Sequence, residues 1–394
     1  MTQNFKRTKF ACYSSYFTMA SIFCLPPLLF VTFHRMYNIS WTLLGTLVLV
    51  NFCTQLCIDL VFSFCSKKFN LNLLIKVMPI LTSLGLTVFA LGPYLFPNLA
   101  YLGMLIGTFI FSLSAGLSEV LLSPTIAAIP SKNPQRDMSL LHSLYGFGVL
   151  SVVLIGSLYI KVFGAENWVY LTLFFAALPI ISAVLFSISP MPDISGEEAT
   201  KPAIKTKKRS IGLALCFGSI FFGSCAEVAM SSWISSYMEA ALNLDKTLGD
   251  ILGMALFAVL LAVTRFLYAK WGKNIIKTLL FGMLGSAICY LIVGLSGNLL
   301  VSAVACILCG VFTSMLWPGT LIMMEENISG VGVASFALMA AGGDLGASVS
   351  PQLLGIVADN FGLKSGMLVC SVFPILGVIL LLIIIKFFKR KEEL

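Results

Sequence analysis

Long apolar runs alternate with short polar segments along all 394 residues of the chain. An α-helix needs about 20 apolar residues to cross the roughly 30 Å hydrocarbon core of a membrane. Twelve runs reach that length without the period-2 alternation of barrel strands, so the pattern predicts an all-α polytopic membrane protein. The predicted spans are residues 10–33, 41–65, 73–92, 99–128, 138–163, 168–188, 210–238, 247–268, 275–295, 298–322, 330–357 and 364–388.

Lysine and arginine residues divide unequally between the two sides that these spans define. With the N-terminus in the cytoplasm, 21 of the 25 residues lie inside, and only Arg35, Lys161, Lys246 and Lys364 lie outside. Inner loops of membrane proteins are enriched in these residues. We therefore expect a multi-pass protein of the cell (plasma) membrane with both termini cytoplasmic. Its short loops are typical of a bacterial inner-membrane permease.

The composition supports a chain embedded in lipid. It is 58% hydrophobic and only 11% charged, against about 25% charged residues in a soluble domain. The net charge of +8 does not indicate nucleic-acid binding, because the basic residues lie in short clusters between spans. The 11 cysteines lie mostly in apolar segments, and the pair Cys306 and Cys309 has no second CxxC, so we interpret them as packing residues.

One long hydrophilic stretch divides the spans into two sets of six. Residues 189–209 carry three prolines, two glutamates and a run of basic residues. We expect an N-terminal six-helix bundle over residues 1–188, a flexible cytoplasmic linker over 189–209, and a C-terminal six-helix bundle over 210–394.

The two halves share short motifs in the same order. Pro124 in span four corresponds to Pro318 in span ten. The Phe163-Gly164 step after span five corresponds to Phe361-Gly362 after span eleven. Shared order favours a duplicated architecture, as in transporters built from internal repeats.

Two six-helix halves joined by a charged linker resemble the major facilitator superfamily over nearly the whole chain. The segments GLSEVLLSPTIAAIP in span four and SLLHSLYGFGVLSVV in span five look like the fucose–proton symporter branch, as does GGDLGASVSPQLLGIVAD in span eleven. The resemblance implies a cavity lined by spans one, four, seven and ten. It also implies that Glu119 contacts the solute or carries a coupled proton.

Ionisable residues inside the spans are the main functional candidates, because a charge at a helix centre costs about 2.5–3.5 kcal/mol in the membrane. Glu119, Glu227 and Asp344 lie deep in their spans, and no base appears at that depth. Glu119 is suited to reversible protonation in apolar surroundings. The alternative for each acid is a structural role, paired with a base or with backbone donors.

Further polar and aromatic residues have two readings each. His142 and Tyr145 lie one turn apart in span five, where His142 can relay protons or only bond the helix start. Asn51 and Gln55 in span two can face the solute or bond neighbouring helices. Trp317 in span ten can stack on a sugar ring or pack against protein.

Residues near the cytoplasmic ends of spans two and eight are expected to control the gate. Asp59 and Arg265 lie there and are interpreted as gating or salt-bridge residues. Pro26, Pro27 and Pro318 are expected to bend their helices and to free backbone carbonyls.

Together these features predict a proton-coupled uptake carrier for a sugar or similar small neutral polar solute, working by alternating access. A drug or organic-cation exporter, acting as a proton antiporter of the same fold, is the alternative, and a channel or sensor stays open. We expect no enzyme activity and no cofactor beyond a proton or other ion gradient, since the sequence has no ATP-binding GxxxxGK motif. The expected partners are the solute and the lipid bilayer, with no nucleic acid, and the protein is expected to be a monomer.

Overall fold

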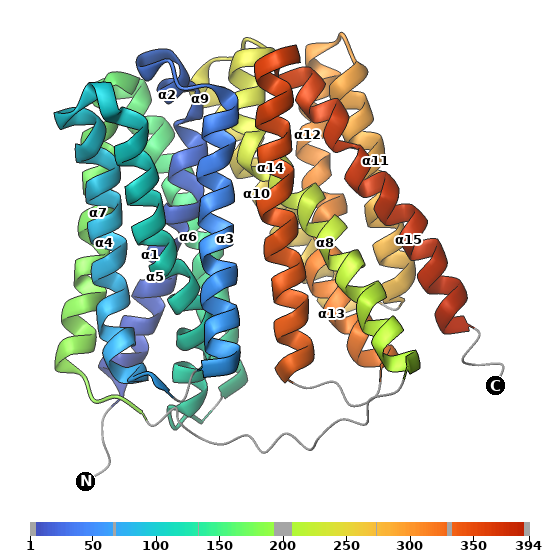
Figure 1. Ribbon diagram of the computed structural model, residues 1–394, viewed down its shortest axis with the longest axis horizontal. Helices are drawn as coiled ribbons and strands as arrows, with labels where there is room; N and C mark the ends of the chain where they lie inside the picture. The colour runs from blue at the N-terminus through green and yellow to red at the C-terminus, as the bar shows by residue number, and fades with distance from the viewer. Residues whose placement is uncertain are drawn as a thin grey trace. The chain divides into compact units, whose positions relative to one another are not determined.

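The computed structural model describes residues 5–65, 68–132, 134–192, 207–272, 274–328 and 333–389. All regular elements in these ranges are helices. The first half contains α1 (Lys6–Leu28), α2 (Phe30–Tyr37), α3 (Trp41–Cys65), α4 (Leu71–Leu95), α5 (Ala100–Ala128), α6 (Pro134–Phe163) and α7 (Trp168–Ile188), with short 3-10 turns η2 (Pro97–Leu99) and η3 (Ala165–Asn167) (Figure 1).

The second half contains more interruptions than the first. Its α-helices are α8 (Lys207–Ser236), α9 (Lys246–Gly249), α10 (Leu256–Trp271), α11 (Ile275–Leu295), α12 (Leu299–Thr313), α13 (Leu316–Asn327), α14 (Val333–Cys370) and α15 (Val372–Lys389). Two π-helical segments, η4 (Tyr237–Ala241) and η5 (Asp250–Ala255), lie between α8 and α10.

The helices account for twelve membrane crossings. Ten segments of the described residues are long and apolar enough to cross a membrane, and the bent pair α1 and α2 makes an eleventh. The segment Ser335–Phe388 is 54 residues long and is broken at Gly362, so it counts as two crossings. The described helices therefore confirm the predicted all-α fold and its twelve spans.

The two Phe-Gly steps of the sequence repeat adopt the same backbone conformation. Gly164, after α6, has φ 85°, and Gly362, inside α14, has φ 82°. A side chain is disfavoured at such angles, whereas glycine adopts them readily. The sharp turn that ends span five is thus repeated after span eleven, as the internal repeat predicts.

Consecutive prolines bend the first crossing. Pro26 and Pro27 lie in the last turn of α1, and α2 leaves at an angle of 48° after Leu29. Each proline lacks a backbone N–H and clashes with the carbonyl four residues earlier. The predicted bend in span one is confirmed.

The chain divides into two compact units. The first comprises Met1–Ile39 with Val50–Glu198, and the second comprises Ser40–Leu49 with Ala199–Leu394. The predicted linker over 189–209 lies mostly outside the described residues. One helix, α3, is shared, because its first turns belong to the second unit and the rest belongs to the first.

The first turn of α3 is bound by a carboxylate of α14. Asp359 accepts hydrogen bonds from the backbone N–H groups of Trp41 at 2.6 Å and Thr42 at 2.7 Å. A carboxylate at a helix N-terminus satisfies free N–H groups and interacts favourably with the helix dipole. The Trp41 ring also lies 5.9 Å, centre to centre, from that of Trp233 in α8.

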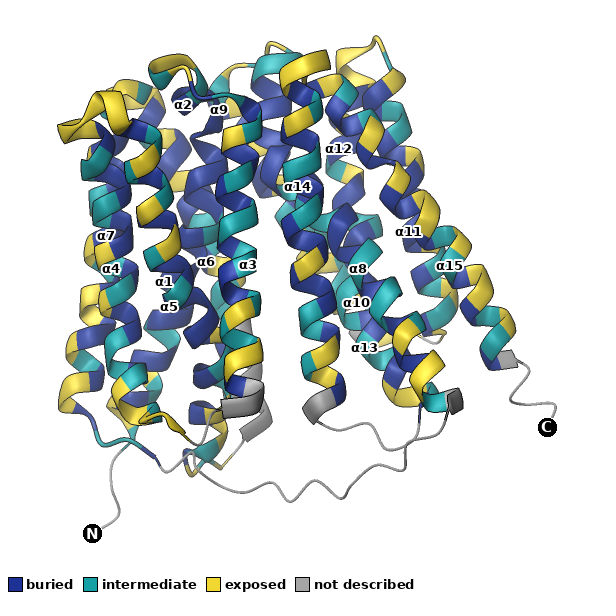
Figure 2. Cartoon of the chain, viewed as in Figure 1, coloured by how far each residue is buried: buried dark blue, intermediate teal, exposed yellow. Residues whose placement is uncertain are grey.

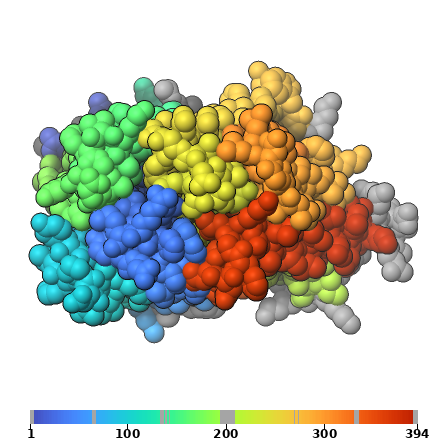
Figure 3. All heavy atoms as spheres, turned by 90° about the horizontal axis from the view of Figure 1, so that it is seen from above, coloured from blue at the N-terminus to red at the C-terminus, as the bar shows by residue number. Residues whose placement is uncertain are grey.

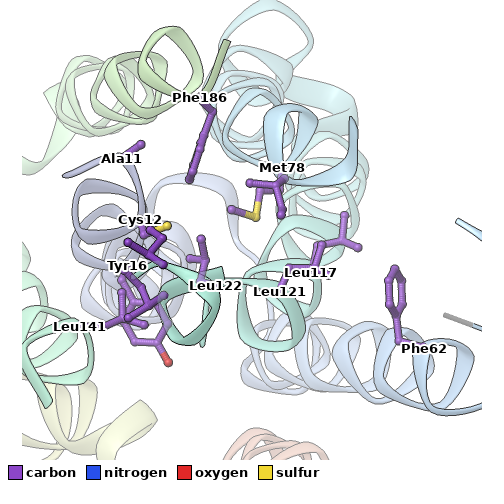
Figure 4. Packing of buried hydrophobic residues seen from close by; sticks show 13 residues of the cluster. Ala11, Cys12, Tyr16, Phe62, Met78, Leu117, Leu121, Leu122, Leu141 and Phe186 are labelled. Atoms are coloured by element: carbon purple, nitrogen blue, oxygen red, sulfur yellow. The ribbon is translucent and has the colours of Figure 1, made fainter. Parts of the chain in front are cut away.

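The first unit has a compact apolar core. Met78 from α4, Leu117 and Leu121 from α5, and Tyr16 from α1 pack together, with the Tyr16 hydroxyl at the margin of the cluster (Figure 4). Seen from above, the cyan and green parts of this unit lie next to each other (Figure 3).

Two glycines allow α4 and α5 to pack backbone to backbone within this unit. A Cβ at Gly107 would lie 2.5 Å from the backbone N of Phe89, and a Cβ at Gly85 would lie 2.5 Å from that of Phe111. Small residues at helix contacts permit this close approach in membranes.

Many large apolar residues of both units are exposed, and Figure 2 marks the exposed residues along the helices in yellow. A soluble protein rarely exposes so many large apolar residues, so these faces are suited to lipid. Exposed examples are Tyr170, Phe174, Ile180, Ile181, Val184 and Ile188 on α7, and Ile375, Leu376, Ile379, Leu382 and Ile383 on α15.

Candidate functional site

A stripe of polar residues runs along α3 within the first unit. Asn51, Gln55 and Asp59 recur every four residues and so share one face of the helix. Gln55 Nε2 donates to Asn51 Oδ1 at 3.2 Å, and Ser112 Oγ of α5 donates to the same oxygen at 2.7 Å. Asn51 and Gln55 are both buried. Asn51 thus bonds the neighbouring helix α5, whereas these bonds of Gln55 stay within α3. A role of either residue toward the solute stays a prediction.

Glu119 lies on α5 beside the end of this stripe. Its side chain is exposed, although Leu117 and Ser118 next to it are buried. It interacts electrostatically with Asp59 of α3 and with Tyr16 of α1. The structure thus brings together two predicted residues, Glu119 and Asp59, that the sequence had placed in different roles. An exposed carboxyl in a membrane helix can exchange protons with water.

Aromatic rings from three helices contact one another, and one of them, Tyr16, interacts with Glu119. The ring of Tyr145 on α6 lies 6.3 Å from that of Tyr16 and 5.9 Å from that of Phe23 on α1. Phe23 lies 5.8 Å from Phe52 on α3. Such rings offer faces on which a sugar or base can stack. The side chain of His142, predicted to act with Tyr145, lies outside the described residues.

In the second unit, Glu227 of α8 forms an ion pair with Arg265 of α10. Arg265 Nη2 lies 3.2 Å from Glu227 Oε1 and 3.3 Å from Oε2. The salt bridge considered for Arg265 is therefore present. The expectation of no base at the depth of the acids is wrong, because the long arginine side chain reaches Glu227 from a position nearer the helix end.

The same arginine also binds a backbone carbonyl at a helix break. Arg265 Nε donates to the carbonyl of Ser314 at 2.7 Å, between α12 and α13. Pro318, four residues later, has no N–H to donate to that carbonyl. The proline predicted to bend span ten thus frees the acceptor that Arg265 uses.

Trp317 and Asp344 lie close to this break and pack tightly. A Cβ at Gly343 would lie 2.1 Å from the Trp317 ring, so the indole rests against the α14 backbone. Asp344, the next residue, is buried, with only 4% of its surface exposed. The glycine before Asp344 therefore serves close packing. The roles of Trp317 and Asp344 in binding stay predictions.

One buried charged cluster was missed by the sequence analysis. Lys246 Nζ lies 2.8 Å from Asp250 Oδ1 and 3.7 Å from Glu239 Oε2. It also donates to Ser235 Oγ at 3.0 Å, and Ser235 donates to Asp250. All four side chains are at least 87% buried. The available signal was the i, i+4 spacing of Lys246 and Asp250.

This cluster coincides with irregular helix geometry. Glu239 lies in the π-helix η4, and Asp250 begins the π-helix η5. Single π-turns inside helices occur frequently at functional sites. The sequence analysis assigned Lys246 only to the outer side of the membrane and predicted no partner for it.

A further ion pair links α1 to the start of α6, outside the membrane spans. Lys9 Nζ donates to Asp137 Oδ2 at 2.5 Å, and Ser131 and Tyr13 also donate to this carboxylate. The Lys9 ammonium, helped by Ser131, holds the pKa of the Asp137 carboxyl below its usual range.

Low pH should abolish the Lys9–Asp137 ion pair. Because the folded pKa of Asp137 is lowered, its contribution is complete above the unfolded value of about 3.9 and is lost as pH falls through the folded value. The pair is partly exposed, so Asp137→Asn should cost less than about 1 kcal/mol. Melting temperatures of wild type and variant should differ at neutral pH and converge as the pH falls through the folded pKa of Asp137. A difference that persists in acid would contradict the assignment, and Glu166→Gln is the matched control.

The sequence matches a family model, and the fold matches solved structures. The model of the Major Facilitator Superfamily matches residues 11–351 and, in an overlapping match, residues 215–393. No curated protein sequence matches the chain.

Solved structures of transporters resemble this fold. The xylose transporter XylE from E. coli has a TM-score of 0.74 at 15% identity, over 96% of this chain and 95% of that one. The nucleoside transporter NupG has a TM-score of 0.68 at 13% identity, over 97% and 98%. FucP, in an outward conformation, has a TM-score of 0.61 at 16% identity, over 95% and 97%. With the family model covering most of its length and twelve crossings in its helices, the chain belongs to the major facilitator superfamily of membrane transporters.

Proposed function

We propose that the chain takes up a sugar or a similar small neutral polar solute together with a proton, by alternating access. The observation that carries this proposal is the setting of Glu119. Its carboxyl is exposed in the middle of a membrane helix, and within the described residues it forms no ion pair. Ionisable groups in membrane helices face cavities and serve in proton relays.

The charge balance of the second unit disfavours an anionic solute. Arg265 already binds the Glu227 carboxylate and the Ser314 carbonyl. An anion would have to displace Glu227 and leave that acid without its base, which is costly in apolar surroundings. A solute without charge avoids this cost.

The similar structures support the same solute class. Among them are a D-xylose–proton symporter, a fucose–proton symporter and a nucleoside transporter. Sugars and nucleosides combine hydroxyl groups with apolar ring faces. The rings of Tyr16, Phe23 and Tyr145, of which Tyr16 interacts with Glu119, suit the ring faces, and the acids suit the hydroxyls.

The charge distribution supports a location in the plasma membrane and an orientation within it. With 21 of 25 Lys and Arg residues on one side, both termini face the cytoplasm of a cell whose plasma membrane holds the protein. Driven by an inward proton gradient, the carrier acts as a monomer and needs no cofactor.

The test is uphill uptake by purified protein in proteoliposomes with an acidic exterior. Labelled D-xylose, L-fucose and uridine are the probes. A gradient of one pH unit, equivalent to 1.36 kcal/mol, supports about tenfold accumulation at one proton per solute. Glu119→Gln should abolish accumulation because it cannot ionise, while solute exchange without a gradient continues.

Glu166→Gln, the same change at an exposed turn residue, is the control and should accumulate solute like wild type. Normal uphill transport by Glu119→Gln would remove Glu119 from the coupling step. Absence of accumulation of all three probes by wild type would refute the solute class.

The acids and aromatic rings together also favour a second candidate, an organic-cation exporter that exchanges its substrate for protons. Cations bind over aromatic faces near carboxylates. Cells that express such an exporter would contain less tetraphenylphosphonium than control cells, whereas an importer of neutral solutes would leave its level unchanged.

A further inference from the structure

Helices α3 and α5 pack in a regular register inside the first unit. Asn51 of α3 accepts a hydrogen bond from Ser112 of α5 at 2.7 Å. One turn later, a Cβ at Gly116 would lie 3.2 Å from the Cα of Gln55 and 2.9 Å from the Cβ of Ile58. From the first contact to the second, the residue numbers rise in both helices, so α3 and α5 run parallel at this point.

The next turn of this register brings two carboxylates to the same level. Glu119 follows Ser112 by seven residues, which is two helical turns, so it projects from the same face of α5. Asp59 follows Gln55 by four residues on the face of α3 that meets α5. The two groups interact electrostatically, as this register requires.

The other helices that pack around this level contribute few charges. Tyr16 of α1 interacts with Glu119, and Tyr145 of α6 contacts the Tyr16 ring. From α4, Met78 Sδ accepts a hydrogen bond from Ser118 at 3.4 Å. At this level Glu119 thus interacts with a carboxylate, Asp59, and a phenol, Tyr16.

Two carboxylates held close together in apolar surroundings do not ionise independently. Ionisation of one disfavours ionisation of the other, and the protons are lost in two steps that belong to the pair. One proton between the two groups removes most of the repulsion and supplies a hydrogen bond.

We infer that Asp59 and Glu119 form one proton-binding site, in which Asp59 is the second member and not a gate residue. The inference rests on the proposed function, in which Glu119 carries the coupled proton. On loading, one proton arrives from water, one O–H bond forms on either carboxylate, and the charge of the pair changes from −2 to −1. Release returns the proton to water on the other side and restores the charge.

Infrared titration of the protein in phosphatidylcholine bilayers tests the pair directly. The C=O band of protonated carboxyls reports occupancy, and the part that Glu119→Gln removes is assigned to Glu119. Asp59→Asn should move the midpoint of that band down by about one pH unit or more, because the neighbouring negative charge is gone. Glu119→Gln should shift the Asp59 band downward in the same way.

Two variants make the result specific. Asp59→Glu keeps the charge and should keep the wild-type midpoint. Asp344→Asn removes an acid of the second unit and should leave the Glu119 midpoint unchanged. If Asp59→Asn does not fold, the Asp59 band in Glu119→Gln still decides the question. The inference is overturned if the titration midpoint of Glu119 or of Asp59 stays unchanged when the other acid is removed.

The titration needs no solute, so it separates this inference from the proposed function. If the bands shift as expected but Glu119→Gln still accumulates solute, the pair is a proton site and the coupling role of Glu119 fails. If Glu119→Gln blocks accumulation but the bands do not shift, Glu119 acts without Asp59.

Discussion

Replacing Lys246 with methionine is expected to lower the free energy of unfolding by about 3–5 kcal/mol. Its ammonium is the positive charge beside Asp250, which is fully buried, and Glu239, which is 9% exposed. Without it, two acids share one apolar site and the Ser235 contact is lost. Removing one partner of a buried ion pair leaves a charge whose desolvation nothing offsets.

Thermal unfolding in detergent measures this effect, and the melting temperature should fall by roughly 10 °C. Lys364→Met, at an exposed lysine that was assigned to the same side of the membrane, is the matched control and should change little. The double variant Lys246→Met with Asp250→Asn should recover much of the loss, since it also removes the fully buried acid. A double variant no more stable than the single one would show that charge balance is not what Lys246 provides.

Gly107→Leu is expected to separate α4 from α5. Even a Cβ at this position would lie 2.5 Å from the backbone N and 2.6 Å from the Cα of Phe89. The clash is with backbone, which cannot rotate away, so the helices must move apart and lose their packing. Overpacking of this kind costs about 1–3 kcal/mol, and more where backbone is displaced.

The measurement is the yield of folded protein and its melting temperature. Gly146→Leu is the matched control, because no atom lies within 4 Å of a Cβ at Gly146 in α6. It should fold with a melting temperature close to that of wild type. Equal losses at Gly107 and Gly146 would mean that membrane insertion, and not helix contact, sets the effect.

The sequence predicted helix positions well where polar residues lie at both ends of an apolar run. The predicted spans 168–188 and 275–295 coincide with α7 and α11. Hydrophobicity sets where a helix enters and leaves lipid, and this is a local property. The span predicted over 298–322 instead contains two helices, since breaks depend on carbonyls and prolines within the run.

The candidate residues could be predicted from the sequence because ionisable residues are rare in membrane spans. Their interaction partners could not be predicted in this way. Asp59 and Arg265 were both interpreted as gating or salt-bridge residues without a named partner, whereas Asp59 interacts with Glu119 and Arg265 pairs with Glu227. Partners are set by the register between helices, which is fixed by contacts such as that of Gly116 with Ile58. Hydrophobic pattern carries no information on that register.

The placement of the first turns of α3 has a consequence for biosynthesis. Trp41 and Thr42 are made early, but Asp359, which binds their N–H groups, follows 318 residues after Trp41. At about 5–20 residues per second, that acid is added roughly 15–60 s later. The start of α3 therefore acquires its native neighbours only when α14 has been synthesised. A nascent chain arrested before Asp359 would leave this stretch open to proteases and chaperones, so the second half completes the folding of a helix encoded in the first.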